Sequence, residues 1–173
     1  GGGGWIGSVP AGTVQLGGLS TGTSTSADLE LTLPFEILTT GAASPGAVLQ
    51  SIAGGGGIVA DVGGNVTIGG TQQANVDASA GSLNYTQLSR SITTGGADSP
   101  GVVLQSIGGG GGLLGAVDGS VTTGSSSAAG SDVRGGSITA VSGAPITTTG
   151  ISSPGFTIQS IGGSGGLIGS APT

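Results

Sequence analysis

The chain has 173 residues. Its only cationic side chains are Arg90 and Arg134, and with eight Asp and Glu residues the net charge is -6. It contains no Cys, His, Met or Lys. Zinc, haem and iron-sulfur sites therefore lack their usual ligands, and a serine nucleophile lacks its usual general base. We predict that the protein is not an enzyme, that it has no catalytic, cofactor-binding or metal-binding residue, and that it binds no nucleic acid, because phosphate binding needs a cationic surface.

Glycine dominates the composition at 42 residues, with seven prolines beside it. Such a share is typical of low-complexity disorder. The mean hydropathy of +0.37 and the short clusters of Val, Ile and Leu argue against disorder. No apolar run approaches the ~18 residues of a membrane-spanning helix, and the opening GGGGWIGSVP has no charged leader region. We expect a segment that is not embedded in a membrane and that is an internal or processed piece of a longer chain.

Short runs rich in β-branched residues, bounded by Gly, Asn, Asp or Ser, predict β-strands along the chain. Helices are not expected, because glycine costs ~1 kcal/mol per interior position relative to alanine and recurs every few residues. The stronger strand predictions fall about 18 residues apart, with weaker ones between them. In chain order, the predicted strands are residues 48–52, 58–62, 66–68, 75–78, 83–87, 92–94 and 102–107.

One phrase occurs three times, as SPGAVLQSIAGGGGIVA, SPGVVLQSIGGGGGLLG and SPGFTIQSIGGSGGLIG. Its glutamines, Gln50, Gln105 and Gln159, are 55 and 54 residues apart. WIGSVP near the start and LIGSAP near the end each follow a glycine run, so the chain ends in the phase in which it begins. We interpret residues 1–173 as one continuous segment of a longer repeat array, with units at about 5–57, 58–112 and 113–166 and the start of another unit at 167–173.

This repeat predicts an all-β parallel solenoid, because a single coil buries its apolar face only when a neighbouring coil covers it. The finer spacing predicts about 18 residues per rung, with two short strands and two glycine-rich corners, and three rungs in each 54-residue superrepeat. About nine to ten such rungs, at about 4.8 Å each, would form a rod of about 45 Å.

Along VVLQSI, successive side chains alternate between the two faces of the predicted strand. Leu104 and Gln105 therefore lie on opposite faces. We expect Leu104 and its counterparts Leu49 and Ile158 to face the core, and the three glutamines to lie outside. Both faces carry apolar residues, so the reverse assignment stays open.

The combination of ITTTG at 146–150, SPG, QSIGG and a glycine run resembles the Gly-rich repeats in passenger regions of large bacterial autotransporters and related surface adhesins. The likeness recurs in all three units and covers roughly half of each. It implies export across the outer membrane and extracellular display at the bacterial cell surface as a right-handed β-helical stalk. The phrase is a repeat signature and implies no catalytic residue.

Two patterns that could bind ligands have simpler interpretations. The glycine runs at 54–57 and 108–112 lack the Lys-Ser/Thr of a phosphate loop and are interpreted as turns. The acidic residues lack the nine-residue rhythm of a calcium β-roll, and we interpret them as scattered solvated carboxylates. These residues are Asp61, Asp77, Asp98, Asp118 and Asp132.

Two further patterns concern surface recognition. Threonine rows could form an ice-binding face, although they come once per coarse unit; their members are Thr39, Thr40, Thr94, Thr148 and Thr149. The lone Trp5 corresponds to Ile58, Leu113 and Leu167 in later units. We therefore expect Trp5 to be a core or cap residue rather than a sugar platform.

Two functions follow from this sequence. The preferred one is a non-enzymatic structural segment of a secreted or surface-displayed adhesin or fibre, an elongated stalk or filament that self-associates end to end, because uncapped solenoid ends expose unpaired strand edges. The alternative is a binding module, whose Thr-, Ser- and Asn-rich faces hold a carbohydrate, a host-surface glycan or ice.

Overall fold

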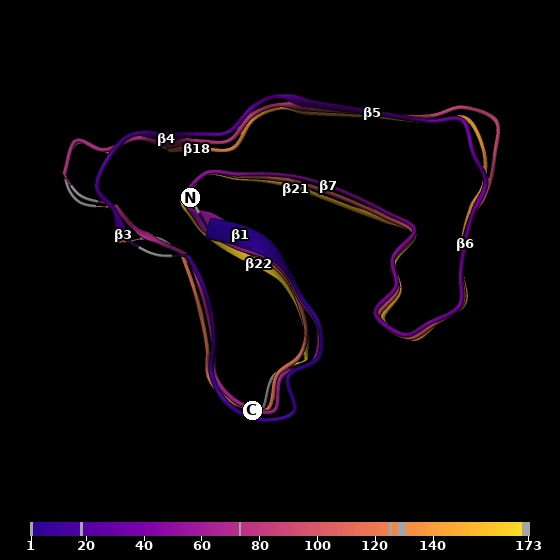
Figure 1. Ribbon diagram of the computed structural model, residues 1–173, viewed down its shortest axis with the longest axis horizontal. Coiled ribbons are helices and arrows are strands. Elements are labelled where there is room, and N and C mark those ends of the chain that lie inside the picture. The colour runs from indigo at the N-terminus through magenta and orange to yellow at the C-terminus, as the bar shows by residue number, and fades with distance from the viewer. Residues whose placement is uncertain (1, 18, 73, 125, 128–130, 171–173) are drawn as a thin grey trace.

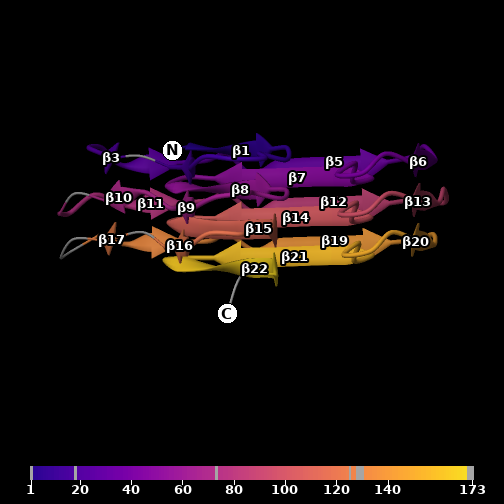
Figure 2. The same ribbon diagram turned by 90° about the horizontal axis from the view of Figure 1, so that it is seen from below.

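A computed structural model describes residues 2–17, 19–72, 74–124, 126–127 and 131–170. These residues form β-strands and connecting turns, and none of them is helical. The strands pair in parallel within seven sheets, each of which holds the corresponding strands of successive turns and forms one wall of the solenoid. Seen from the N-terminal side, the chain winds clockwise as it recedes, so the solenoid is right-handed (Figure 1, Figure 2). The prediction of an all-β parallel solenoid is confirmed.

The predicted rung of about 18 residues is wrong, because one turn of the solenoid takes 54 or 55 residues. Gln105 is the register partner of both Gln50 and Gln159, at separations of 55 and 54 residues. The strands predicted between these glutamines lie in different walls of the same turn. The stack therefore holds three turns and is about 14 Å thick at the usual strand spacing, rather than a rod of about 45 Å (Figure 2).

Seven strands make one turn, and each stacks on its counterparts in the next turn. The first turn holds β1 (Gly2–Ile6), β2 (Val14–Leu16), β3 (Leu19–Ser20), β4 (Ser24–Thr25), β5 (Leu29–Leu33), β6 (Ile37–Thr39) and β7 (Ala47–Ile52). The second holds β8 (Gly55–Val59), β9 (Val66–Ile68), β10 (Thr71–Gln72), β11 (Ala78–Ser79), β12 (Leu83–Gln87), β13 (Ile92–Thr94) and β14 (Val102–Ile107). The third holds β15 (Gly110–Ala116), β16 (Val121–Thr123), β17 (Ser126–Ser127), β18 (Val133–Arg134), β19 (Ile138–Ser142), β20 (Ile146–Thr148) and β21 (Phe156–Ile161), and β22 (Ser164–Ser170) follows.

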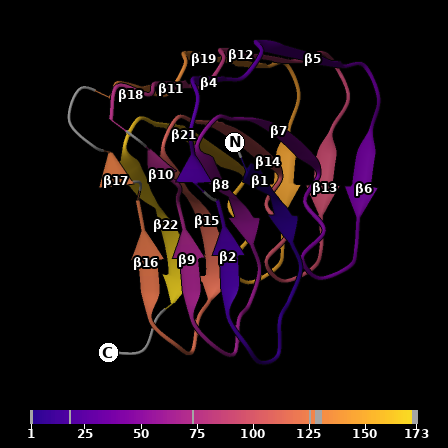
Figure 3. The ribbon, with the colours of Figure 1, turned by 60° about the vertical axis from the view of Figure 1, so that its left-hand side comes forward.

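The path of each turn is a spiral rather than a ring (Figure 1). From β1, in the middle of the view, the chain rounds the bottom loop and rises through the wall that contains β2, β9 and β16, which lie side by side in Figure 3. It then crosses the top as β5 and descends as β6. After the Ser-Pro-Gly turn, β7 runs back beneath β5 to the middle, where β8 begins. Two inner walls, one containing β7 and one containing β8, therefore divide the cross-section into two lobes.

Each lobe has its own hydrophobic core. The upper core lies between the β5, β6 and β7 walls, and its fully enclosed members are Leu83, Tyr85, Ile92, Val102 and Leu104. There the rings of Tyr85 and Phe156 meet edge to face with centroids 5.8 Å apart. The lower core lies between the β1 and β2 walls and is formed by Val14, Val59, Val62, Val66, Ile68, Leu114 and Val117.

Burial depends on which turn a residue occupies. Leu104, in the middle turn, is 0% exposed, whereas its register partner Ile158, in the last turn, is 51% exposed. Leu49, in the first turn, packs against the upper core but is only partly buried. The prediction that the Leu104 position faces the core is confirmed, and the exposure of Ile158 arises because no further turn covers it.

The prediction that the glutamines lie outside is wrong. Gln105 is 0% exposed, because β14 belongs to an inner wall and both of its faces are covered. Alternation along a strand tells which side chains share a face, but it does not tell whether the other face meets water or a second wall.

Candidate functional site

The three residues of each QSI triplet make three different contacts that hold the inner wall in place. The glutamines form a ladder along the stack: Gln50 Nε2 donates to Gln105 Oε1, and Gln105 Nε2 donates to Gln159 Oε1, each at 2.6 Å. Gln159 Nε2 also donates to the carbonyl oxygen of Gly112 in the neighbouring inner wall, at 3.2 Å. The amides thus join successive turns and, at this point, the two inner walls.

The serine of the triplet joins the inner wall to the outer wall. Ser106 Oγ donates to the carbonyl of Gly81 at 2.8 Å and accepts from the amide of Gly136 at 2.7 Å. One turn earlier, Ser51 Oγ likewise donates to the carbonyl of Ala27 and accepts from the amide of Gly81. A zigzag of hydrogen bonds therefore runs along the stack and ties the β7 wall to the chain that enters the β5 wall.

The isoleucine of the triplet covers a glycine in the strand that opens the same turn, as Ile107 of β14 does for Gly56 of β8. A Cβ on Gly56 would lie 3.0 Å from Cδ1 of Ile107, and one on Gly110 would lie 2.6 Å from the Cα of Gly69. The glycine strand is thus pressed between an isoleucine and the backbone of the β2 wall. The interpretation of residues 54–57 and 108–112 as turns is wrong for most of each run, because β8 begins at Gly55 and β15 at Gly110.

The threonine rows do not form an outward ice-binding face. Thr94 is completely buried and donates through Oγ1 to the carbonyl of Ser99, and Thr39 donates in the same way to Ser44. These threonines brace the Ser-Pro-Gly turn. The more exposed row of Thr40 and Thr149 is interrupted in the middle turn by Gly95, whose amide bonds to the carbonyl of Thr39.

The acidic residues are spread around the turn, and the described residues contain no group of three or more His, Cys, Asp or Glu that could hold a metal ion. Asp132 pairs with Arg134, and the hydrogen bond from Arg134 lowers the pKa of that carboxyl. Asp77 Oδ1 accepts from the amide of Asp132 at 2.8 Å. Asp61 Oδ1 accepts from the amide of Ala116, also at 2.8 Å. Asp61 and Asp77 therefore serve as acceptors between successive turns.

A groove of about 480 Å³ lies between an inner wall and the Ser-Pro-Gly turns. One side carries a row of register partners, Trp5, Ile58, Leu113 and Leu167, and the other carries the prolines of the three turns, Pro45, Pro100 and Pro154. Because each row takes one residue from each successive strand or turn, the groove follows the stack. We call it the proline groove.

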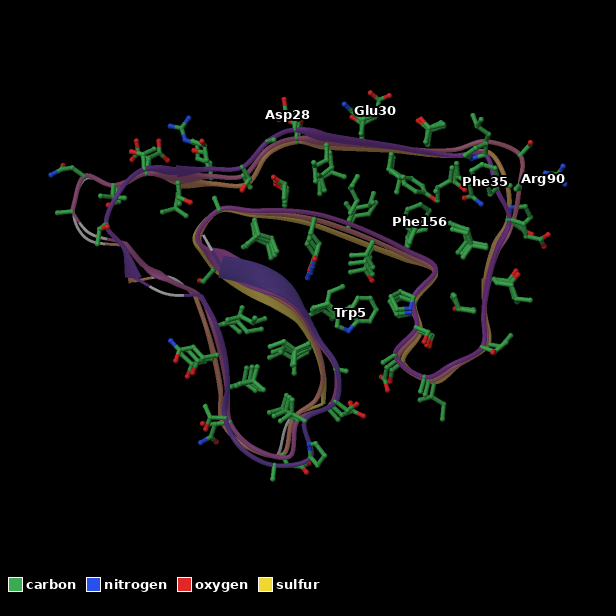
Figure 4. The ribbon with its side chains drawn as sticks, viewed as in Figure 1. Trp5, Asp28, Glu30, Phe35, Arg90 and Phe156 are labelled. Carbon is green, nitrogen blue, oxygen red and sulfur yellow. The ribbon has the colours of Figure 1, made fainter. Side chains whose placement is uncertain are left out.

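Trp5 lies at the N-terminal end of the proline groove. Its side chain extends from β1 into the space beside the Ser-Pro-Gly turns and is 39% exposed (Figure 4). Of the two roles predicted for Trp5, the core role is wrong, because the side chain is not enclosed; the residue lies in the edge strand of the stack, where Ile58 continues its row. The row could be predicted from the spacing of the repeat in the sequence. The groove could not, because it forms only when the spiral path brings the Ser-Pro-Gly turns opposite this row.

Asp98 gives the proline groove a charged edge. It precedes Ser99-Pro100 and takes a left-handed backbone conformation with φ of 53°, as Ala43 and Ser152 do at the same position in the other turns. Burial raises the pKa of Asp98, and the negative charge of Asp61 raises it further. Repulsion between these two carboxylates therefore accompanies the folded state.

The two ends of the stack carry strand edges that no described residue pairs. At one end these are β1 to β7, and at the other they are β16 to β22, the last strand of each sheet. Such edges present N–H and C=O groups to any further strand. Half-exposed aliphatic side chains, including Ile158 and Leu167, lie on the turn at the C-terminal end.

No described helix is long and apolar enough to cross a membrane. Comparison of the chain with protein-family models, curated proteins and solved structures finds no match.

Replacing Gln105 by leucine should cost about 2–4 kcal/mol in the free energy of unfolding, measured by denaturant titration. The change leaves the Gln50 donor and the Gln159 acceptor, both half-buried, without their ladder partners, at about 1–2 kcal/mol each, in the lower part of the range for an unpaired polar group. Replacing all three glutamines by leucine should cost less than the single change, because no amide then loses its partner. A triple variant that is less stable than Gln105→Leu would contradict the ladder.

Asp98→Asn should make the protein more stable at pH 7 by roughly 0.2–1 kcal/mol, the size of a screened surface charge pair. The folded state raises the pKa of Asp98 above its ordinary value of 3.8. Protonation of Asp98 therefore stabilises the folded wild type. This contribution to the free energy of unfolding is lost as the pH rises from 3.8, the ordinary pKa, through the raised pKa of the folded state. The stability gained by Asp98→Asn should therefore shrink below about pH 4.

Thermal melts between pH 3 and pH 7 measure this gain, with Glu30→Gln as a charge-matched control on the outer face. Identical pH profiles for Asp98→Asn and the wild type would refute the prediction.

Proposed function

We propose that this chain is a non-enzymatic structural segment of a secreted or surface-displayed bacterial fibre, an elongated stalk extended by further turns of the same repeat. The observation that carries this proposal is the difference in burial between turns. Side chains of the middle turn, such as Val102, Leu104 and Ile107, are fully enclosed, while their partners at the ends are not. In a solenoid each turn is stabilised by its neighbours, so further turns would bury what the ends expose.

The strand order favours continuation through the chain itself. Six sheets hold three strands, whereas the sheet β1-β8-β15-β22 holds four. A second copy placed to continue the six three-stranded sheets would bring its β1 to the position that β22 occupies. Simple end-to-end stacking of separate chains therefore requires β1 or β22 to leave its sheet. A polypeptide that runs from β22 into a strand of the β2 type avoids this conflict.

The surface location rests on the resemblance of the SPG-QSI-glycine phrase to autotransporter and adhesin repeats. The ladders support a mechanical role for that phrase. Each turn is joined to the next by sheet hydrogen bonds, by the glutamine amides and by the hydroxyl of Ser99, which accepts from the amide of Ser44 at 3.0 Å. These contacts recur in every turn, so the number of turns can change without a change in their chemistry.

A tandem chain tests the proposal. Residues 1–170 are joined directly to residues 9–173, because Ser170 is the register partner of Ala116 and Val9 falls in the row of Val62 and Val117, one position later. The tandem should melt in one cooperative transition, with Tm at least about 5 °C above the single chain, since it buries several half-exposed aliphatic side chains. In solution scattering, the particle should be longer by about three strand spacings, roughly 14 Å.

The matched control joins residues 1–173 to residues 1–173 and so places two strands of the β1 phase in succession. It should gain little Tm, because one of those strands has no place in the stack. If the in-phase tandem melts at the temperature of the single chain, or if its halves melt separately, the proposed extension by added turns is wrong.

A further inference from the structure

The proline groove runs along the stack from β1 to β22, and the three turns of this chain form it without a further turn. Its lining comes from all three turns, and its volume exceeds that of the depression lined by Gly3, Gln50 and Ile52 and of the one lined by Val9, Asp61 and Val62. A volume of about 480 Å³ lies within the range of about 300–1,000 Å³ typical of small-molecule sites.

The lining of the proline groove is mainly aliphatic and aromatic. Leu113 and Ile58 belong to the middle of the wall row, while Trp5 and Leu167 at its ends are 39% and 48% exposed. Opposite them lie the three proline rings. An occupant that covered this row would remove apolar surface from water at about 25 cal/mol per Å². The row runs along the stack for about 14 Å, so it fits a linear occupant rather than a round one.

An extended peptide does not suit this groove. The wall strands β8 and β15 pair on both sides with neighbouring turns, so their backbone groups point along the stack. The backbone of the opposite turns is also paired: the amide of Gly46 donates to Pro100, and that of Gly101 donates to Pro154. A peptide would bury its own N–H and C=O groups without partners, at about 1–3 kcal/mol for each group. An aliphatic chain carries no such groups.

The charges at the edge select the sign of the occupant. Asp98 lines the proline groove, and Asp61 lies beside Gly115, another lining residue, close enough to act on Asp98. Neither arginine lines the groove: Arg134 pairs with Asp132, and Arg90 lies at the outer corner of the molecule (Figure 4). A cationic group at the edge would relieve the repulsion between the two carboxylates, whereas an anionic group would increase it.

We propose that the proline groove binds a linear aliphatic chain with a cationic head group, with the chain along the Trp5-Ile58-Leu113-Leu167 row and the head group beside Asp98. The solenoid wall supplies the apolar contact, and the carboxylate edge supplies the selection against fatty acids and other anionic amphiphiles.

Titration with decyltrimethylammonium, below its micelle-forming concentration, tests the proposal on the whole chain. Trp5 is the only tryptophan, so its fluorescence reports directly from the groove. We expect a saturable change that weakens as salt is added. Shortening the chain from decyl to octyl should weaken binding about 15-fold, since each buried methylene is worth about a four-fold change. Decyl sulfate and tetramethylammonium should bind much more weakly than the decyl cation.

Two pairs of variants separate the contributions of charge and apolar contact. Asp98→Asn should weaken binding about three- to five-fold, while Glu30→Gln, on the outer face, should leave it unchanged. Leu113→Ser should weaken binding about ten-fold, while Leu38→Ser, at an outer corner where the side chain is 69% exposed, should leave it unchanged. Because Asp98→Asn is expected to stabilise the fold, its weaker binding cannot arise from unfolding. Circular dichroism checks that the leucine variants retain the β-structure.

Several results would overturn the proposal. These are the absence of saturable binding, equal affinity for decyl sulfate, or Asp98→Asn and Leu113→Ser variants that bind as their controls do. A peptide of alternating Leu and Lys that bound more tightly than the decyl cation would also overturn it, because the occupant would then be a polypeptide.

Discussion

The structure depends on a close approach of backbone to backbone in the middle of each turn. There the glycine strand, β8 or β15, lies against the backbone of the β2 wall on one side and under the isoleucine of the QSI triplet on the other. Any side chain at Gly110 would overlap Gly69. Glycine alone permits the chain to fold inward from the outer wall and out again, and this path produces the two lobes, the long turn and the proline groove.

The repeated phrase is explained by this meeting of walls. The serine ties the inner wall to the outer one, the glutamine joins successive turns, and the isoleucine fills the space above a glycine. Each residue type is required by what lies around it, so the phrase recurs wherever the spiral returns to the same point. The variable segments between phrases form the outer walls, where one face meets water and many side chains suit the strand.

Local patterns predicted most strands but not their partners; the strand predicted at 75–78 is wrong, because Asn75 lies in a turn with φ of 60° and β11 begins only at Ala78. β9, β12, β13 and β14 lie where β-branched runs predicted them, and Leu104 faces a core as alternation predicted. The 18-residue rung was wrong, because strands spaced evenly along a sequence can occupy different walls of one long turn. The burial of Gln105 was missed because strand periodicity does not reveal a second covering wall. The spacing of the glutamines, at 55 and 54 residues, equals the length of one turn and was the feature of the sequence that indicated which strands pair.

The most direct test of the account is the distance between residues 55 positions apart in the chain. The protein has no cysteine, so spin labels can be placed at Asn84→Cys and Thr139→Cys, register partners on the outer wall. The account predicts strong dipolar broadening for this pair, at about one strand spacing. It predicts none for Asn75→Cys with Thr93→Cys, 18 residues apart, because β10 and β11, which flank Asn75, lie at the opposite end of the turn from β13, which contains Thr93 (Figure 2). Broadening in the second pair and its absence in the first would contradict a 54-residue turn.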